Sequence, residues 1–359
     1  MRKKIGVLYE VFGDEQNVNA QSLNARGIAV RLDPERFQSS FFVSEYPDPG
    51  LVRKPHIRLI TLPPRLRAHF VKLYLLCSSN ELVVYPRDYF HTPFFSEILR
   101  RSRRRKKVIY PLELPIDYLK GENPRAFEQT CRILRESDLI VPISAYTSRI
   151  LQQEIGIESP TIIPLGIDTQ FFSPVKRRAQ SLVQVLFAGR LIARKGLEQF
   201  VEAAAFFPRM QFRIVGSAYG KEDGAFARRI QQRVEADGLS NVTFMGSLSQ
   251  KQLRQLMWES DILLHPSSVE GIPRVTLEAG ATGMPSIVYD YYQTPSVVDG
   301  ITGFQVKTFD EMMDRLRLLA EDRDLRWQMG EAAAEHVKQF DWGGLAKRWE
   351  VVFRELAAN

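Results

Sequence analysis

The sequence predicts an α/β protein built from two doubly wound, Rossmann-like domains that face a central crevice. Short apolar runs alternate with segments whose apolar residues recur at helical spacing, which predicts parallel sheets with helices on both faces. The pattern stops at a polar stretch, Ser173–Leu182, and then starts again. A chain of 359 residues is long enough for two domains. Ligands of such proteins bind beyond the carboxyl ends of the strands, so we expect the site in the crevice.

The first domain is expected over residues 1–165. Its strand-like runs are IGVLYEVF, SSFFVSEY, IRLITLP, ELVVYP, KKVIYPLEL, SDLIVPIS and PTIIPLG. Segments such as NVNAQSLNARGIAVRLD and NPRAFEQTCRILRES carry the helical spacing between them. The first run is interrupted by Glu10 and is not followed by a small-residue cleavage site, so we interpret it as a strand and not as a signal peptide.

The second domain is expected over residues 166–340. Its strand-like runs are VQVLFAG, MQFRIVGS, NVTFMGS, SDILLHPS, PSIVYD and GFQV, each followed by a helical stretch. From about Phe309 onward the pattern is helical. The final segment, residues 341–359, is expected to be an amphipathic helix with these residues on its apolar side: Trp342, Leu345, Trp349, Val352 and Phe353.

Composition fits a globular protein of a reducing compartment. Hydrophobic residues make up 44% of the chain, which is enough for two cores. No stretch approaches the roughly 18 apolar residues of a transmembrane helix. The two cysteines, Cys77 and Cys131, lie far apart with apolar neighbours, which predicts buried free thiols in the cytoplasm.

The positive charge is concentrated in the first domain. Between Leu51 and Lys107 there are 14 basic and 3 acidic residues, and the densest part is RRSRRRKK, Arg100–Lys107. We expect this region to contact an anionic membrane surface; the alternative is a solvated surface without a specific partner. Residues 64–77 have the composition of a helix lying on a membrane, although a core-facing helix fits equally well. A nucleic-acid partner is not expected, because no matching fold or aromatic pattern accompanies the basic block.

The stretch FAGRLIARKG, Phe187–Gly196, follows a strand and opens a helix. It differs from a Walker A loop, because Arg194 precedes Lys195 where that motif requires glycine. Arg190 and Lys195 lie on this strand-to-helix turn, beside free N–H groups and the positive end of a helix. This combination suits a diphosphate. The alternative is a solvated turn with two surface cations.

The stretch SSVEGIPRVTLEAGATGMP places two glutamates, Glu270 and Glu278, around an expected helix start. A buried strand ends at Pro266, and Pro273 fits the first turn of a helix. Glu270 is then expected in the loop, facing the crevice, and Glu278 lies about one and a half turns into the helix. Two carboxylates so placed can bind two parts of one ligand through its hydroxyl groups. The alternative is one capping and one surface glutamate.

No metal site is expected. The five histidines, the two cysteines and the acidic residues show no ligand spacing. The one Asp-x-Asp sequence, Asp322-Arg323-Asp324, lies between two helical patterns, and we interpret it as helix capping.

Residues 160–356 resemble the retaining glycosyltransferases of family 4, which have the GT-B fold. A collinear series of motifs carries the resemblance: IPLGIDTQFF, FAGRLIARKG, FRIVGSAYG, NVTFMGSLSQKQLRQLMWESDILLHPSSVEGIPRVTLEAGATGMPSIV and VVDGITGFQV. The resemblance implies a GT-B fold with a C-terminal helix that returns toward the N-terminal domain. It also implies a nucleotide diphosphate sugar as co-substrate and no cofactor.

The same resemblance implies roles for individual residues. Glu270 would contact hydroxyls of the donor sugar, and Glu278 would contact those of the nucleotide ribose. Arg190 and Lys195 would stabilise the leaving diphosphate, where negative charge develops as the glycosyl–phosphate bond breaks. The other implied donor-binding positions are glycines and the loop before the helix: Gly189, Gly216, Gly246, Gly271, Ile272 and Pro273.

Three features depart from the family pattern. The usual glycine-rich acceptor loop is reduced to Gly13. Glu113 stands where the family commonly has a histidine, so it is a candidate to orient the sugar or to face the reacting carbon, or else a structural glutamate at a strand end. The segment Tyr289–Ser296 replaces a Gly-Gly and Glu pattern at the edge of the donor site.

These features predict a retaining, metal-independent glycosyltransferase that moves a sugar from a nucleotide diphosphate sugar to a glycan or lipid-linked acceptor. We expect it in the cytoplasm, peripherally on the inner face of the membrane. Two alternatives remain open. One is a sugar-nucleotide epimerase of the same fold, although no His/Asp/Glu cluster is placed for acid–base work at the sugar. The other is a non-catalytic protein of this fold that binds carbohydrate or membrane.

Overall fold

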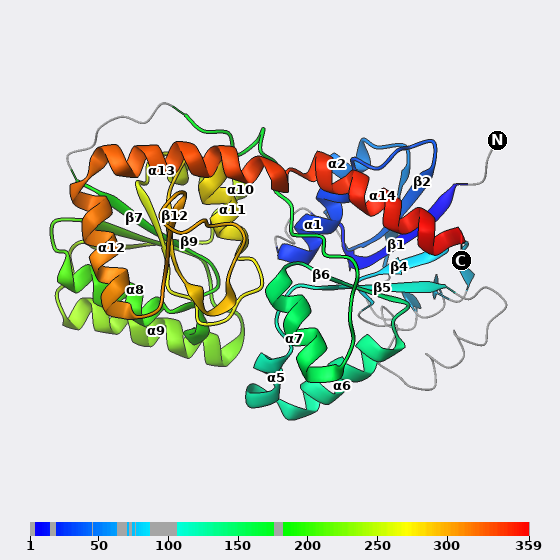
Figure 1. Cartoon of the computed structure of the whole chain (residues 1–359), viewed down its shortest axis with the longest axis horizontal. Helices are drawn as coiled ribbons and strands as arrows, with labels where there is room; N and C mark the ends of the chain where they lie inside the picture. The colour runs from blue at the N-terminus through cyan, green and yellow to red at the C-terminus, as the bar shows by residue number, and fades with distance from the viewer. Residues whose placement is uncertain are drawn as a thin grey trace. The chain divides into compact units, whose positions relative to one another are not determined.

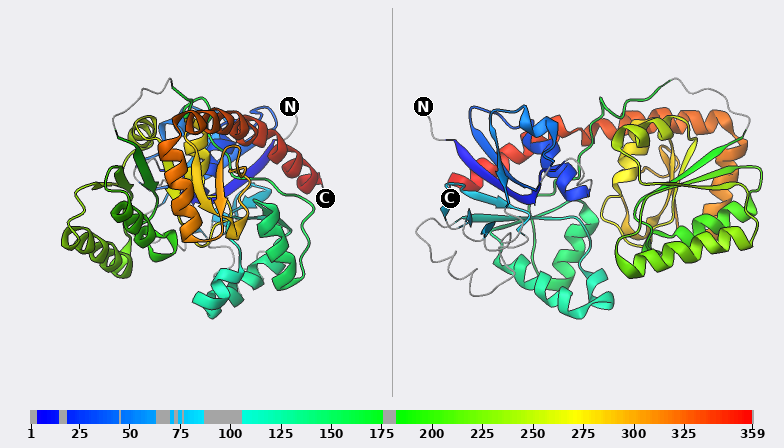
Figure 2. Two further views of the ribbon diagram at one scale, coloured as in Figure 1. Left: turned by 60° about the vertical axis from the view of Figure 1, so that its left-hand side comes forward. Right: turned by 180° about the vertical axis from the view of Figure 1, so that it is seen from behind.

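The computed structural model describes residues 4–14, 19–44, 46–62, 70–71, 74–75, 77–86, 106–175 and 182–358. The chain forms two compact units (Figure 1, Figure 2). Unit 1 consists of Met1–Gly166 and Phe340–Asn359, and unit 2 consists of Ile167–Gln339. Within the described ranges, no helix combines the length and the apolar character needed to span a bilayer.

Unit 1 contains a six-stranded parallel sheet in the order β3-β2-β1-β4-β5-β6. Its strands are β1 (Ile5–Phe12), β2 (Phe37–Val43), β3 (Ile57–Thr61), β4 (Leu82–Val84), β5 (Lys107–Leu112) and β6 (Leu139–Pro142). Successive residues of β1 belong to different hydrophobic clusters, with Val7 and Tyr9 in one and Leu8 in the other. Both faces of the sheet are therefore covered. The strand order reverses between β1 and β4, where open sheets of this kind bind ligands.

Short capping sequences start several helices of unit 1. Its helices are α1 (Ala20–Ala29), α2 (Pro49–Val52), α5 (Asp117–Glu122), α6 (Pro124–Glu136), α7 (Ala145–Ile155) and α14 (Trp342–Ala358). Ser144 and Thr147 form a capping box at α7. Asn123 accepts a hydrogen bond from the Ala126 amide at the start of α6, and Pro124 occupies the first helical position.

The C-terminal helix α14 packs against α1 and β1 of unit 1, as predicted (Figure 1). Leu345, Trp349 and Phe353 lie in the same hydrophobic cluster as β1. The indole of Trp342 lies directly on the backbone of α1: a Cβ atom added to Gly27 would come within 2.2 Å of the ring. The amphipathic pattern of the last segment thus corresponds to a helix that completes the core of unit 1.

Unit 2 repeats the topology of unit 1. Its six-stranded parallel sheet has the order β12-β11-β10-β7-β8-β9. The strands are β7 (Gln184–Ala188), β8 (Gln211–Val215), β9 (Val242–Gly246), β10 (Ile262–His265), β11 (Ser286–Tyr289) and β12 (Gly303–Val306). The order reverses between β7 and β10. The loops that follow these two strands are therefore neighbours, although they are far apart in sequence.

The helices of unit 2 lie between its parallel strands or follow the last strand, β12. They are η1 (Ala193–Lys195), α8 (Leu197–Phe206), α9 (Gly220–Ala236), α10 (Gln250–Trp258), α11 (Arg274–Ala281), η2 (Asp290–Tyr292), α12 (Phe309–Glu321), α13 (Arg323–His336) and η3 (Val337–Phe340), which runs into unit 1. Asp322 caps α13 by accepting from the Leu325 amide at 2.9 Å. The Asp322-Arg323-Asp324 sequence is therefore a helix start, as predicted.

Two predictions about unit 1 are wrong. The run PTIIPLG forms no strand: residues 161–166 have no regular secondary structure, although the Ile163 amide donates one hydrogen bond to the Pro142 carbonyl oxygen at the end of β6 at 3.1 Å. Cys131 is buried as expected, but Cys77 is exposed, and both thiols are free. Most of the basic block and of the segment 64–77 lies outside the described residues.

We expect Gly27→Ala to lower the stability of unit 1 by about 1–3 kcal/mol, because the new methyl group would overlap the Trp342 ring. An alanine inside a helix normally stabilises it by about 0.5–1 kcal/mol, so steric overlap has to outweigh this preference. Urea unfolding measures the change. Gly121→Ala is the matched control, because its added methyl group meets no atom within 4 Å. Equal stability of the two variants would contradict the packing described for Trp342.

Candidate active site

The loops after β7 and β10 are joined by direct hydrogen bonds at the carboxyl end of the sheet of unit 2. The Ser268 amide donates to the Arg194 carbonyl oxygen at 2.9 Å. The Arg194 side chain donates to the Val269 carbonyl oxygen at 2.8 Å. Gly196, with φ +73°, caps α8, and a Cβ atom there would lie 2.0 Å from the Pro266 carbonyl oxygen. Only glycine allows the two loops to approach this closely.

Glu270 lies at the centre of this junction and is 5% exposed. Its Oε1 accepts hydrogen bonds from Ser267 Oγ at 2.7 Å, from His265 Nε2 at 3.3 Å and from Lys195 Nζ. The Arg194 guanidinium lies 3.7 Å from the same oxygen. Among the described residues, none of these contacts uses Oε2. These contacts thus converge on one oxygen of the Glu270 carboxylate.

The charges of this cluster support one another. Burial alone would raise the pKa of Glu270, but Lys195, His265 and Arg194 outweigh it and hold the pKa well below its usual value. Burial lowers the pKa of Lys195, while the Glu270 carboxylate opposes that effect. Burial also lowers the pKa of His265, so the imidazole is neutral and donates from Nε2. We conclude that a buried carboxylate–ammonium pair lies at the end of β10.

Several members of the cluster were missed by the sequence reasoning. The sequence analysis noted Arg194 only because a Walker A loop requires glycine at that position. It gave no role to His265 and Ser267, which stand at the end of a strand. Tyr292 is also buried close by: burial, and then the charge of Glu270, raises its pKa, so its hydroxyl stays protonated. The signal that could have found them is position, because the loops after β7 and β10 flank the reversal of strand order.

Glu278 is buried in α11, one turn after Arg274, whose Nε donates to Glu278 Oε1 at 3.0 Å. Burial raises the pKa of Glu278, and Arg274 partly offsets this rise. A carboxylate that is both buried and paired is the opposite of the surface glutamate considered as an alternative. The helix itself begins one residue later than expected, because Pro273 occupies the N-cap position.

The remaining predicted donor-binding residues line the carboxyl ends of the strands in unit 2. Gly271, Ile272 and Pro273 are buried between Glu270 and α11. Gly216, with φ +144°, passes so close to Gly189 that an added Cβ atom would lie 1.8 Å from the Gly189 carbonyl oxygen. Gly246 ends β9 with φ +68°.

Arg190 lies apart from the contacts around Glu270. Its guanidinium pairs with Asp223 of α9 at 2.9 Å and lies over the Tyr219 ring. The side chain is about half exposed, so this pair is a weak surface interaction that a stronger anion could replace. Arg190 still lies close enough to contribute to the lowered pKa of Lys195.

The segment Tyr289–Ser296, where the sequence departs from the family pattern, is linked to α11 by hydroxyl groups. Ser296 Oγ lies 2.5 Å from Thr276 Oγ1 of α11 and 2.8 Å from Thr294 Oγ1. The rings of Tyr289 and Tyr291 stack with centroids 4.5 Å apart. Hydroxyl side chains thus attach this segment to the helix that carries Glu278.

Glu113, the candidate of unit 1, follows β5. Its Oε1 accepts a hydrogen bond from the Tyr85 hydroxyl at 2.9 Å, and Tyr85 follows β4. Gly13 follows β1 in the same sheet, and its amide donates to the Phe42 carbonyl oxygen at 2.8 Å. These positions therefore lie at the carboxyl ends of β1, β4 and β5, where the strand order of unit 1 reverses.

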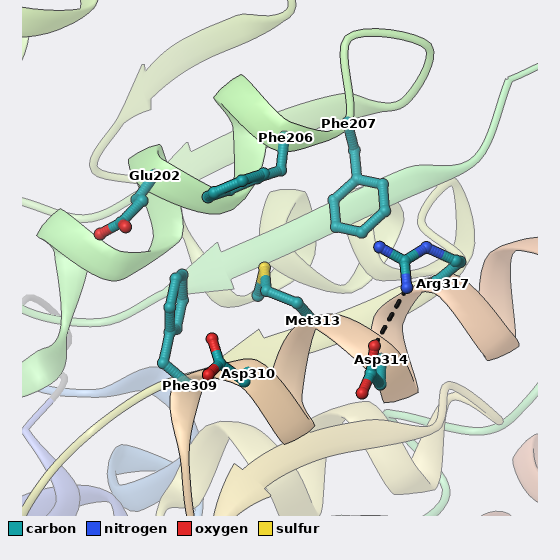
Figure 3. A pocket seen from close by; sticks show the side chains of 8 residues that line it. All are labelled: Glu202, Phe206, Phe207, Phe309, Asp310, Met313, Asp314 and Arg317. Atoms are coloured by element: carbon teal, nitrogen blue, oxygen red, sulfur yellow. Dashed lines mark hydrogen bonds and ion pairs between the residues drawn. The ribbon is translucent and has the colours of Figure 1, made fainter.

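A cavity of about 300 Å³ lies elsewhere in unit 2, between α8 and α12 (Figure 3). Its lining residues are Glu202, Phe206, Phe207, Phe309, Asp310, Met313, Asp314 and Arg317. Figure 3 shows the side chains of the two helices facing one another across it. It contains none of the predicted site residues and none of the residues around Glu270, so it is separate from the candidate active site.

Part of the chain is similar to known proteins. Residues 168–336 match the family model for glycosyl transferases group 1. The D-inositol 3-phosphate glycosyltransferase of Paenarthrobacter aurescens is 30% identical over 216 residues, which are 55% of this chain and 52% of that protein. The GDP-mannose-dependent monoacylated alpha-(1-6)-phosphatidylinositol monomannoside mannosyltransferase of Corynebacterium glutamicum is 28% identical over 259 residues, 65% of this chain and 64% of that protein.

Solved structures match over almost the whole chain. The sucrose-phosphate synthase of Thermosynechococcus elongatus has a TM-score of 0.85 at 21% identity, covering 99% of this chain and 100% of that one. HepE from Anabaena, solved with UDP and glucose, has a TM-score of 0.77 at 18% identity, covering 98% and 100%. At this identity the likeness concerns the fold.

The chain therefore has the GT-B fold, and its residues 168–336 match the family model of the group 1 glycosyltransferases, the family that the motifs resemble. The alignments span between half and two thirds of the length of the two curated relatives named above.

We expect Lys195→Met to destabilise unit 2 by about 3–5 kcal/mol, because it leaves the Glu270 carboxylate buried without its ammonium partner. Adding Glu270→Gln to this variant should recover at least about 2 kcal/mol, since the uncompensated charge is then removed. Urea unfolding of the wild type, the two single variants and the double variant provides the cycle. Additive effects would show that the two groups do not interact.

The stability difference between wild type and Glu270→Gln should depend on pH. The folded pKa of Glu270 lies below its ordinary value of 4.5, so the ionised carboxylate stabilises the fold above about pH 4.5. This contribution should decrease as the pH falls below that value. Urea unfolding of both proteins between pH 7 and pH 3 measures it. A difference that stays constant over this range would contradict the lowered pKa.

Proposed function

We propose that the protein is a retaining glycosyltransferase that uses a nucleotide diphosphate sugar and no metal ion. The observation that carries this proposal is the cluster of Lys195 and Glu270 at the reversal of strand order in unit 2, directly before α11. A fixed cation, a carboxylate with one engaged oxygen and the positive end of a helix come together there. These are the groups that a sugar diphosphate requires.

The proposed reaction develops negative charge on the departing diphosphate. The bond between the anomeric carbon and the phosphate oxygen breaks, and its electron pair stays on that oxygen. The acceptor hydroxyl supplies the new glycosidic oxygen, and its proton passes to the departing diphosphate. Lys195 is held in place by Glu270 before any substrate arrives, so its charge needs little reorganisation. Arg190 would exchange its surface partner Asp223 for the diphosphate.

The two glutamates would bind the two ends of the donor. The second oxygen of Glu270 is suited to accept a hydrogen bond from a sugar hydroxyl, because its first oxygen is fully engaged. Glu278, oriented by Arg274, would accept from the ribose. The protonated, buried hydroxyl of Tyr292 would be a donor near the sugar, which makes the segment Tyr289–Ser296 a determinant of sugar identity.

The acceptor side is proposed for unit 1, with Glu113 at the carboxyl end of its sheet. Relatives act, by their names, on inositol phosphate and on a phosphatidylinositol mannoside. The excess of basic residues between Leu51 and Lys107 supports a glycan or lipid-linked acceptor that carries negative charge. We place the protein in the cytoplasm, peripherally on an anionic membrane surface. UDP and GDP sugars are the first donors to test, given the ligands of HepE and of the mannosyltransferase.

The two alternatives predict different behaviour. An epimerase would interconvert nucleotide sugars without an acceptor, and a non-catalytic protein would bind them without turnover. The buried Lys195–Glu270 pair favours transfer, because an ammonium is placed to stabilise a leaving group, whereas proton exchange on a sugar carbon needs a free base.

We expect Glu270→Gln to lower kcat by about 100-fold and Glu278→Gln to raise the KM for the donor, because only the first contact is made at the reacting sugar. Nucleotide diphosphate release is measured with UDP and GDP sugars, with and without acceptor glycans. Asp324→Asn is the control, since this side chain on α13 is 79% exposed. Release by wild type at the same rate without acceptor, or full activity of Glu270→Gln, would refute the proposal.

A further inference from the structure

Unit 1 contains a continuous chain of hydrogen bonds that the proposed function does not use. It runs from Glu113 through Tyr85 to Asn24. From Asn24 it continues to Gly166 and Trp342, which lie close to the two points where the polypeptide passes between unit 1 and unit 2. All five residues belong to unit 1. The bonds join the ends of β4 and β5 to α1 and to the start of α14.

Asn24 is the branch point of this chain. It lies inside α1, is 2% exposed and uses both ends of its amide. Its Oδ1 accepts from the Gly166 amide at 3.0 Å and from Trp342 Nε1 at 3.2 Å. Its Nδ2 donates to the Tyr85 hydroxyl at 3.3 Å. Asparagine is not favoured inside helices, so a buried one with both ends bonded indicates a specific role.

The direction of each bond follows from the donors. Gly166 N–H and Trp342 Nε1–H can only donate, which fixes Oδ1 of Asn24 toward them and Nδ2 toward Tyr85. The Tyr85 hydroxyl then accepts from Asn24, so its own proton points to Glu113 Oε1. Burial, and then the charge of Glu113, raises the pKa of Tyr85, so the hydroxyl keeps that proton.

The backbone of Tyr85 shows that this arrangement is held under strain. Tyr85 has φ +59°, a left-handed conformation that is rare for a bulky residue. Its amide donates to the Ile109 carbonyl oxygen at 3.2 Å, which fixes it to β5, the strand that leads to Glu113. Strained residues persist where the surroundings over-determine them, and they concentrate at functional sites.

The other end of this series of hydrogen bonds lies close to the two points where the polypeptide passes between the units. Unit 1 ends at Gly166, and it resumes at Phe340, two residues before Trp342. A Cβ atom on Gly166 would lie 1.9 Å from the Trp342 ring, so the two segments are in direct contact. One oxygen atom, Asn24 Oδ1, accepts from both.

We propose that Asn24 is a positioning residue for Glu113. By donating to Tyr85, Asn24 directs the tyrosine proton onto the Glu113 carboxylate. By accepting from Gly166 and Trp342, it links that carboxylate to both segments of unit 1 that lead to unit 2. This inference rests on the proposed function only in giving Glu113 a place in the transfer reaction. The hydrogen bonds from Asn24 through Tyr85 to Glu113 form a relay that can be tested by titration, without a measurement of enzymatic activity.

Asn24→Asp is the decisive variant, because it keeps an oxygen for Gly166 and Trp342 but replaces the donor to Tyr85 by a second acceptor. The tyrosine proton would then be shared between two carboxylates. We expect the pKa of Glu113 to rise by about one pH unit in Asn24→Asp, and similarly in Tyr85→Phe, since a donor to a charged group is lost. Carboxyl ¹³C NMR titration measures it, with Glu113→Gln assigning the signal.

Trp342→Phe is the matched control. It removes the Nε1–H donor but keeps an aromatic ring and the Asn24–Tyr85–Glu113 bonds. It should lower Tm by about 2–4 °C and leave the Glu113 pKa unchanged. An equal pKa change in Trp342→Phe would mean that packing, and not the relay, acts on Glu113. An unchanged pKa in Asn24→Asp would overturn the inference.

Kinetics then test the link to the reaction. In an active protein, Asn24→Asp and Tyr85→Phe should move the acidic limb of kcat/KM to higher pH by the same amount as the NMR titration, with a lower kcat. An acidic limb that does not move would refute a role of the relay in transfer. Absence of transfer by wild type with every donor, combined with the expected NMR result, would refute the proposed function and leave the relay standing.

Discussion

The buried contact between Lys195 and Glu270 is the interaction on which the candidate site depends. A carboxylate and an ammonium are both costly to bury alone, and each makes the burial of the other tolerable. Their contact also joins two loops that are 75 residues apart in sequence. The order of the strands makes this possible, since β7 and β10 are adjacent and both loops leave the same edge of the sheet. The site is thus a product of the topology.

Unit 1 also has a carboxylate at the end of a strand. Glu113 follows β5 in a sheet with the same strand order, and its Oε1 accepts a hydrogen bond from Tyr85, which accepts one from Asn24. The hydrogen bond from Tyr85 comes from a neutral hydroxyl, whereas Glu270 accepts one from the Lys195 ammonium, and a neutral donor stabilises a carboxylate less strongly than a cation does.

Much of the fold could be predicted from the sequence, because parallel strands buried on both faces appear as short apolar runs between polar ends. The same reasoning failed for PTIIPLG, where buried residues with a single backbone hydrogen bond to β6 produce the same apolar pattern. Within the site, Glu270 and Lys195 could be selected one by one, but their contact depends on strand order, which no local pattern contains. His265 and Ser267 were not recognised, because both act by donating hydrogen bonds to Glu270 Oε1. Their spacing in the sequence gives no sign of these bonds. Tyr85 was missed because a positive φ angle at a tyrosine leaves no mark in the sequence.

The discontinuous make-up of unit 1 has a consequence for synthesis. Residues 167–339 form a complete unit, whereas the hydrophobic cluster around β1 is finished only when Trp349 and Phe353 are in place. During synthesis, unit 2 can therefore be complete while unit 1, whose first strand is made earlier, still lacks the part of its core that α14 supplies. The last residues of the chain are thus needed to finish the unit that contains its first strand.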